Sequence, residues 1–143
     1  MTRDEIERLD EQAVAAWDRG DADAFVSLLG DDFVWYDWTL PEPIRDREMA
    51  RQYFSTWTGA FPDMRTTRTT RVVGEDAVAT ELEWTGTNSG PMVMGGNEIP
   101  PTHRTVTGRG SYMAWVRDGK IVEFRSHPDV AGIMMQLGLM PQM

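Results

Sequence analysis

The second half of the chain constrains the fold most, because it contains four strand-like runs. These runs are rich in β-branched and aromatic residues, which favour strands. They span residues 64–74, 77–87, 104–117 and 120–127. The segment "GED" joins the first run to the second, and "RDGK" joins the third to the fourth. Both segments are typical of tight hairpin turns. Tight turns join antiparallel neighbours, so the pattern predicts an antiparallel sheet. The connection 88–103 is too long for a plain hairpin loop, and we expect it to cover a cavity or an oligomer surface.

The first half reads as helices around one short strand. Residues 2–19 show helical spacing of apolar residues and begin with Thr2 and Glu5, the pattern of a capping box. Further helices are predicted from residue 21 or 23, over 47–58 and over 129–139, and a strand over 31–38. This order predicts an α+β fold, in which three N-terminal helices and a short C-terminal helix close over a curved antiparallel sheet. Such a sheet leaves a concave hydrophobic pocket.

The composition excludes several classes of protein. A length of 143 residues suits one domain, so we expect residues 1–143 to form a single domain. The absence of cysteine rules out a disulfide framework, a zinc–thiolate site and a cysteine nucleophile. A net charge of −9 argues against a nucleic-acid surface and against docking on anionic membranes. No apolar run is long enough for a membrane helix, and the charged N-terminus is unlike a signal peptide, so we expect a cytoplasmic protein.

Three stretches of the chain carry a resemblance to a known superfamily. They are "AAWDRGDADAFVSLLGDDFVWYD" at 15–37, "IPPTHRTVTGRG" at 99–110 and "DGKIVEFRSHPDVAGIMMQLGLMP" at 118–141. Together they resemble the nuclear transport factor 2-like superfamily, and within it the SnoaL-like polyketide cyclase and ester cyclase group. The resemblance implies a cone-shaped fold, a pocket for a small hydrophobic molecule, a homodimer, and no metal or cofactor. The superfamily includes isomerases, cyclases, epoxide hydrolases, dehydratases and non-catalytic binders, so it leaves the reaction open.

The ketosteroid isomerase branch of the superfamily can be matched residue by residue. An ungapped count from the Gly-Asp turn places Asp37 at the position of that branch's general base. The tyrosine that is an oxyanion donor on the first helix of that branch is matched by Ala13. Its second oxyanion acid falls near Ser111 or Tyr112. The resemblance therefore implies that the base persists while the isomerase oxyanion hole does not.

Two other branches of the superfamily differ more at their functional positions. Epoxide hydrolases use an Arg-x-Asp pair and a further aspartate, where this chain has Arg109-Gly110-Ser111 and Ser126. Both aspartates are replaced, which argues against that chemistry. The aspartate of the polyketide cyclases falls either at Ser126, where it is lost, or at Asp129, where it is kept.

Four residues are candidates for acid–base catalysis. Asp37 lies between aromatic neighbours in "VWYDW", and a carboxylate in a dry pocket can take a proton next to a carbonyl. The alternative for Asp37 is a strand-end residue that starts the next loop. His127 and His103 are the only histidines, and each is a candidate proton shuttle or hydrogen-bond donor. The alternative for His127 is a residue with satisfied hydrogen bonds at the junction of strand and helix. The alternative for His103 is a loop residue in solvent. Asp129 follows Pro128 and precedes an apolar helical run, which favours a helix N-cap over a catalytic acid.

Aromatic and methionine side chains are the candidate ligand contacts, because flat apolar ligands pack well on rings and on adaptable thioethers. The candidates are Trp17, Tyr36, Trp38, Trp57, Trp84, Met92, Tyr112, Trp115 and Met134. The alternative for each of them is ordinary core packing. Tyr112 and Trp115 differ in parity on one predicted strand, so only one of them can line the pocket, and the other is free to face a partner subunit.

Two functions agree with these features. The first is a cofactor-independent enzyme that cyclises, isomerises or dehydrates a small hydrophobic carbonyl compound, with Asp37 or His127 moving the proton. The second is a binding protein that has the same pocket and no chemistry. The sequence lacks the motifs of zinc proteases, serine hydrolases and nucleotide-binding proteins, so it does not support those readings.

Overall fold

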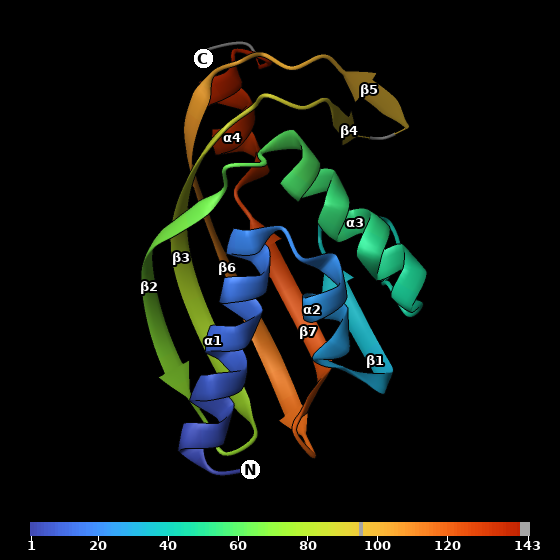
Figure 1. The fold of residues 1–143 in the computed structure, drawn as a ribbon, viewed down its shortest axis with the longest axis vertical. Coiled ribbons are helices and arrows are strands. Elements are labelled where there is room, and N and C mark those ends of the chain that lie inside the picture. Colours follow the sequence, from blue (N-terminus) through green and yellow to red (C-terminus); the bar gives the residue numbers. More distant parts are fainter. Residues whose placement is uncertain (95, 141–143) are drawn as a thin grey trace.

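A five-stranded curved sheet covered by helices forms the body of the molecule. The computed structural model describes residues 1–94 and 96–140. The strands of the sheet lie in the order β1 (Leu29–Asp37), β7 (Lys120–Pro128), β6 (Thr105–Arg117), β3 (Ala77–Thr87) and β2 (Arg65–Val73). The helices are α1 (Arg3–Arg19), α2 (Ala22–Ser27), α3 (Arg47–Ala60) and α4 (Val130–Leu137). Figure 1 shows α1 lying across one face of the sheet. The predicted α+β class is confirmed.

The sheet is mixed, and this corrects the prediction of a wholly antiparallel sheet. Strands β2, β3, β6 and β7 pair antiparallel, as the hairpin pattern predicts. Strand β1 instead pairs parallel with β7, in a register that sets Asp37 opposite Ser126. A tight turn does not join these two strands, so local sequence does not determine their relative direction. Because they run in parallel, their carboxyl ends meet at the same edge of the sheet.

The turns and helix ends follow the chemistry of their residues. Asp118 and Gly119 join β6 to β7 with φ values of 53° and 79°, the positive angles that a two-residue hairpin turn requires. Helix α1 begins with the predicted capping box of Thr2 and Glu5. It ends at Gly20, whose φ of 64° is favourable for a residue without a Cβ atom.

The connection 88–103 contains a short hairpin of β4 (Met92–Met94) and β5 (Asn97–Ile99), which the sequence pattern did not predict. The fully buried Asn88 side chain holds this segment in place. Its amide nitrogen donates to the carbonyl oxygens of Ala60 (3.2 Å) and Gly90 (2.9 Å), and its oxygen accepts from the Thr102 N–H and hydroxyl (2.9 Å each). One side chain thus joins both ends of the connection to the end of α3.

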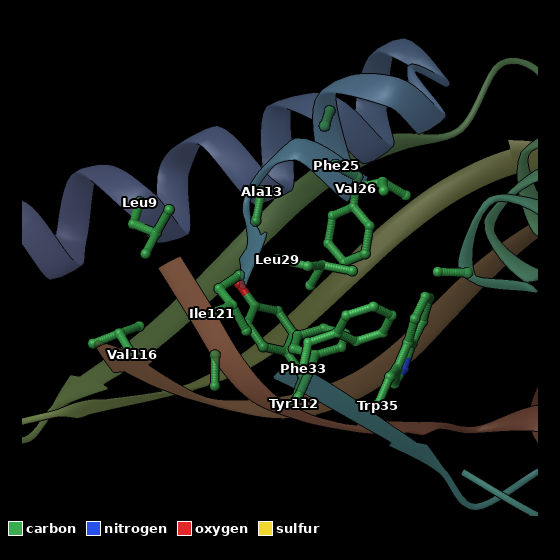
Figure 2. Packing of buried hydrophobic residues seen from close by; sticks show 14 of the residues in the cluster. Leu9, Ala13, Phe25, Val26, Leu29, Phe33, Trp35, Tyr112, Val116 and Ile121 are labelled. Atoms are coloured by element: carbon green, nitrogen blue, oxygen red, sulfur yellow. The ribbon is translucent and has the colours of Figure 1, made fainter. Parts of the chain in front are cut away.

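Buried side chains form two clusters, and a cavity draws its lining from both. The first lies between α1, α2 and the sheet, where Phe25, Trp35 and Tyr112 fill the space between the helices and the strands (Figure 2). The second gathers Phe61, Trp84 and further residues of α4 and β4. Trp17 and Leu82 pack against both clusters, so the boundary between the two clusters runs past these residues. The interior is therefore not one continuous packed core.

Candidate active site

The cavity is mainly apolar and lies between the two clusters. Its volume is about 120 Å³. One water molecule needs roughly 10–15 Å³ on the same measure. Four indole rings contribute to its wall: Trp17, Trp35, Trp57 and Trp84. Asp37 and Arg109 are the charged residues in the lining. The cavity therefore suits a small, largely apolar organic molecule.

Asp37 is a buried carboxylate at the wall of this cavity, with 4% of its surface exposed. Its Oδ1 accepts hydrogen bonds from the N–H (3.0 Å) and the hydroxyl (2.5 Å) of Thr39. Its Oδ2 accepts from the hydroxyl of Ser126 (2.5 Å), which in turn accepts from Nε1 of Trp35 (2.9 Å). These donors come from β1, from the turn after it and from β7. The parallel register described above is what brings Ser126 to Asp37.

Among the described residues, Asp37 forms no ion pair. Arg109 also lines the cavity, but its Nε donates to Glu83 at 3.2 Å. The negative charge of Asp37 is therefore stabilised by neutral donors rather than by a cation.

Tyr53 of α3 is the hydroxyl-bearing ring nearest to Asp37 in this hydrogen-bond network. Its hydroxyl lies 2.9 Å from Oγ1 of Thr39, and its ring packs edge-on against Trp35 with centroids 5.3 Å apart. Burial, followed by the negative charge of Asp37, raises the pKa of the Tyr53 phenol well above its usual range. The phenol is consequently protonated, and hence a hydrogen-bond donor, throughout the physiological range.

The other three predicted catalytic residues lie apart from this network. His127 borders the cavity, but its side chain is exposed and its ring packs at a tilt against Trp38, with ring centroids 6.0 Å apart. His103 is exposed in the 88–103 connection and does not line the cavity. Asp129 caps α4, where its Oδ1 accepts from the Gly132 N–H at 2.9 Å, so the cap interpretation is confirmed.

The predicted ligand contacts divide between the two faces of the sheet. Trp17, Trp57, Trp84 and Tyr112 line the cavity. The parity argument holds, because Tyr112 is buried on the cavity side and the Trp115 ring stacks under the Arg125 guanidinium on the opposite face (4.9 Å). Tyr36 and Trp38 also lie outside the cavity lining, with centroids 5.9 Å apart. Met92 and Met134 are buried in the second cluster and do not line the cavity.

The positions matched to the isomerase oxyanion hole do not supply a free acid or phenol. Ala13 and Ser111 both line the cavity. Tyr112 presents its ring to the cavity, but its hydroxyl donates to the buried carboxylate of Asp10 on α1. Burial, then the charge of Asp10, raises the pKa of Tyr112. This phenol is therefore committed to the core.

Metal-binding and membrane-spanning features are not found in the part of the chain that the structure describes. No three His, Asp or Glu side chains within residues 1–94 and 96–140 are arranged to hold a metal ion. Within the same residues, no helix has the length and apolar character needed to cross a bilayer.

Comparison with known proteins places the chain in a family. The family profile described as SnoaL-like polyketide cyclase matches residues 7–137, which is most of the chain. The chain belongs to the SnoaL-like polyketide cyclase family. No curated protein matches this SnoaL-like chain significantly.

Solved structures with the same fold cover nearly the whole SnoaL-like chain. AclR from Streptomyces galilaeus, a proposed hydroxylase, is 25% identical with a TM-score of 0.83, over 99% of this chain and 86% of its own. IdmH from Streptomyces antibioticus, a proposed polyketide cyclase, is 29% identical with a TM-score of 0.75, over 92% and 97%. TsrD from Streptomyces laurentii is 23% identical with a TM-score of 0.80, over 98% and 99%. Since one fold carries different proposed reactions, the fold alone does not decide the chemistry.

The sequence did not single out Tyr53, Thr39 and Trp35 as site residues of the SnoaL-like domain, and it named Ser126 only as a position where a family aspartate is replaced. Two signals were available for the aromatic residues. Tyr53 is four residues before Trp57 on one helix, so both lie on the same face. Trp35 shares strand parity with Asp37, whereas Tyr36 and Trp38 have the opposite parity. No local signal points to Ser126, because its contact with Asp37 depends on strand order.

Proposed function

We propose that the protein is a cofactor-independent acid–base enzyme, of the cyclase or isomerase type, that acts on a small hydrophobic carbonyl compound. The observation that carries the proposal is the buried Asp37 carboxylate, which borders an aromatic cavity and has no cationic partner among the described residues. The family membership and the likeness to IdmH support a cyclase-type reaction. Asp37 is the general base in this proposal.

The reaction begins with proton transfer from carbon to oxygen. Asp37 removes a proton from the carbon next to the carbonyl. The electron pair of the broken C–H bond moves onto the carbonyl group, which gives an enolate. In an isomerisation, protonated Asp37 returns the proton to another carbon of the conjugated system. In a cyclisation, the enolate carbon attacks a second carbonyl carbon, and the proton ends on the new alkoxide oxygen. Both routes balance without an oxidant or reductant, and general-base catalysis of this kind contributes about 10²–10⁴-fold.

Proton abstraction can be tested without the natural substrate. We would measure exchange of the C1 hydrogens of 2-tetralone, a bicyclic apolar ketone, for deuterium in D₂O by proton NMR. Asp37→Asn should slow the enzyme-dependent exchange by about 10²-fold or more. Asp118→Asn is the matched control, because Asp118 lies in the exposed β6–β7 turn, where asparagine also tolerates positive φ. Equal exchange rates for the parent and Asp37→Asn would refute the proposal.

A binding protein for small hydrophobic molecules is the second candidate function. It is favoured by the Asp37–Thr39 contacts, because a carboxylate that accepts an N–H two residues ahead also stabilises the turn that follows its strand. In that case the parent protein would bind 2-tetralone without accelerating exchange. The NMR experiment distinguishes the two functions directly.

We also propose that the protein is a homodimer formed through the face of the sheet opposite the cavity. In support, Trp38 is 61% exposed, and Arg125 lies between the rings of Tyr36 (5.5 Å) and Trp115 (4.9 Å). Exposed aromatic residues and arginine are enriched in protein interfaces. Light scattering should give twice the monomer mass, and Trp38→Lys should shift the protein toward the monomer. A monomeric parent protein at micromolar concentration would contradict the proposal.

A further inference from the structure

The protons of the Asp37 network can be assigned from its distances. Ionised Asp37 can only accept hydrogen bonds, so the Thr39 hydroxyl must donate its single proton across the 2.5 Å contact with Oδ1. Oγ1 of Thr39 therefore acts as the acceptor in its 2.9 Å contact with Tyr53. The Tyr53 hydroxyl is the donor in that contact. Its proton points along the network toward Asp37.

The same count leaves one acceptor position open on Asp37. Ser126 donates to Oδ2 and accepts from the Trp35 N–H, while Oδ1 accepts twice from Thr39. A carboxylate oxygen has two lone pairs, so Oδ1 is saturated and Oδ2 keeps one free. Oδ2 is thus the atom with capacity to take a proton from a ligand.

The Tyr53 proton can turn to a ligand at little cost to the protein. Rotation about the bond between the ring and the hydroxyl oxygen redirects the proton while the partly buried ring stays in place. Thr39 would lose a donor, but Thr39 is exposed and water can replace the phenol. Tyr112, the other phenol in the cavity lining, has no such freedom because its hydroxyl is bonded to buried Asp10.

Building on the proposed function, we infer that Tyr53 is a further catalytic residue, whose hydroxyl donates to the substrate carbonyl oxygen while Oδ2 of Asp37 takes the proton from the neighbouring carbon. The geometry suits this division, because Tyr53 and Asp37 are linked through a single side chain, Thr39. In the substrate, the reacting carbon and the carbonyl oxygen are two bonds apart, so the base and the donor must also lie close together. The developing enolate oxygen needs a donor, and the Tyr53 hydroxyl belongs to a side chain that lines the cavity together with Asp37.

Two measurements test the inference, with Tyr36→Phe as the matched control for Tyr53→Phe, since Tyr36 lies outside the cavity lining. The first is the deuterium exchange of 2-tetralone, where loss of an oxyanion donor should lower kcat by about 10²-fold. KM should change by less than about 3-fold, because the interaction is strongest in the transition state. The second is binding of 2-naphthol, a stable analogue of the enol, against 2-methylnaphthalene, which has the same shape and no hydroxyl. Tyr53→Phe should reduce the preference for 2-naphthol by about 5- to 10-fold.

The outcomes separate this inference from the proposed function. If Asp37→Asn abolishes exchange but Tyr53→Phe has parent-like kcat and an unchanged preference for 2-naphthol, the role of Tyr53 is wrong and the base stands. If Asp37→Asn exchanges like the parent, the proposed function is wrong, and the naphthol preference alone then decides whether Tyr53 donates to ligands. Failure of the parent to bind either naphthalene would overturn both.

Discussion

Gly108 controls the shape of the cavity through Trp84, and Gly108→Ala tests this relation. A Cβ atom on Gly108 would lie 2.1 Å from Cε2 and 2.4 Å from Nε1 of Trp84, where ordinary contacts begin near 3.4 Å. The indole would have to move by more than 1 Å, on the order of the missing contact distance. On its other sides Trp84 is confined by Phe61, at 5.0 Å between ring centroids, and by Gly86. The cavity is the open space into which it can move.

The expected cost follows from the crowding of a closely packed core. Inserting a methyl group into such a site destabilises proteins by about 1–3 kcal/mol. For a domain of this size that corresponds to a decrease in Tm of roughly 3–10 °C. Because Trp84 would move into the cavity, the affinity for 2-naphthol should also fall, by about 10-fold or more if one good apolar contact is lost.

Calorimetry and tryptophan fluorescence measure these two effects on the same samples. Gly59→Ala is the matched control, because no atom lies within 4 Å of its added Cβ and Gly59 is exposed near the end of α3. That control should be neutral or stabilising by about 0.5–1 kcal/mol, since alanine favours helix over glycine. A Gly108→Ala protein with parent-like Tm and 2-naphthol affinity would refute the packing argument.

Two further predictions concern buried ionisable groups. Arg71→Met should destabilise the fold by about 2–3 kcal/mol in urea unfolding, because it removes the 3.0 Å ion pair of buried Asp10. This cost is lower than that of breaking a fully buried pair, because Arg71 is partly exposed. A loss of stability under about 0.5 kcal/mol would contradict the prediction. Burial, with the charges of Asp37 and Asp10, raises the pKa values of Tyr53 and Tyr112, so the folded state keeps two protons that an unfolded chain loses above about pH 10. Stability should therefore fall as the pH rises through that value. Absorbance at 295 nm should show no more than one of the three tyrosines ionising while circular dichroism reports a folded protein. Two ionised tyrosines in the folded state would contradict the prediction.

Local chemistry in the sequence predicted the elements well. The caps Thr2 and Asp129 and the positive-φ turn at Asp118–Gly119 lie where the pattern places them, because capping and turn geometry depend on a few neighbouring residues. The hairpin inside 88–103 was missed. It is anchored by the side chain of Asn88, whose partners at Ala60 and Thr102 are remote in sequence.

The alternation of side chains along a strand also carried information about the site. It predicts that Tyr112 and Trp115 face opposite sides, which the structure confirms. Applied to β1, the same rule groups Trp35 with Asp37 and separates both from Tyr36. The candidate site could thus have been narrowed from the sequence by using parity in every strand.

The sequence by itself determined helices α1 to α4, the five strands of the main sheet, the faces of those strands and the presence of a carboxylate among aromatic residues. Only the tertiary structure decided which strand lies beside β1 and in which register, because a parallel pair has no connecting turn to specify it. That register decides the partner of Asp37. Ser126 and His127 are adjacent in the chain but point to opposite faces of β7, so pairing Asp37 with Ser126 brings the hydroxyl to the carboxylate and leaves the imidazole against Trp38.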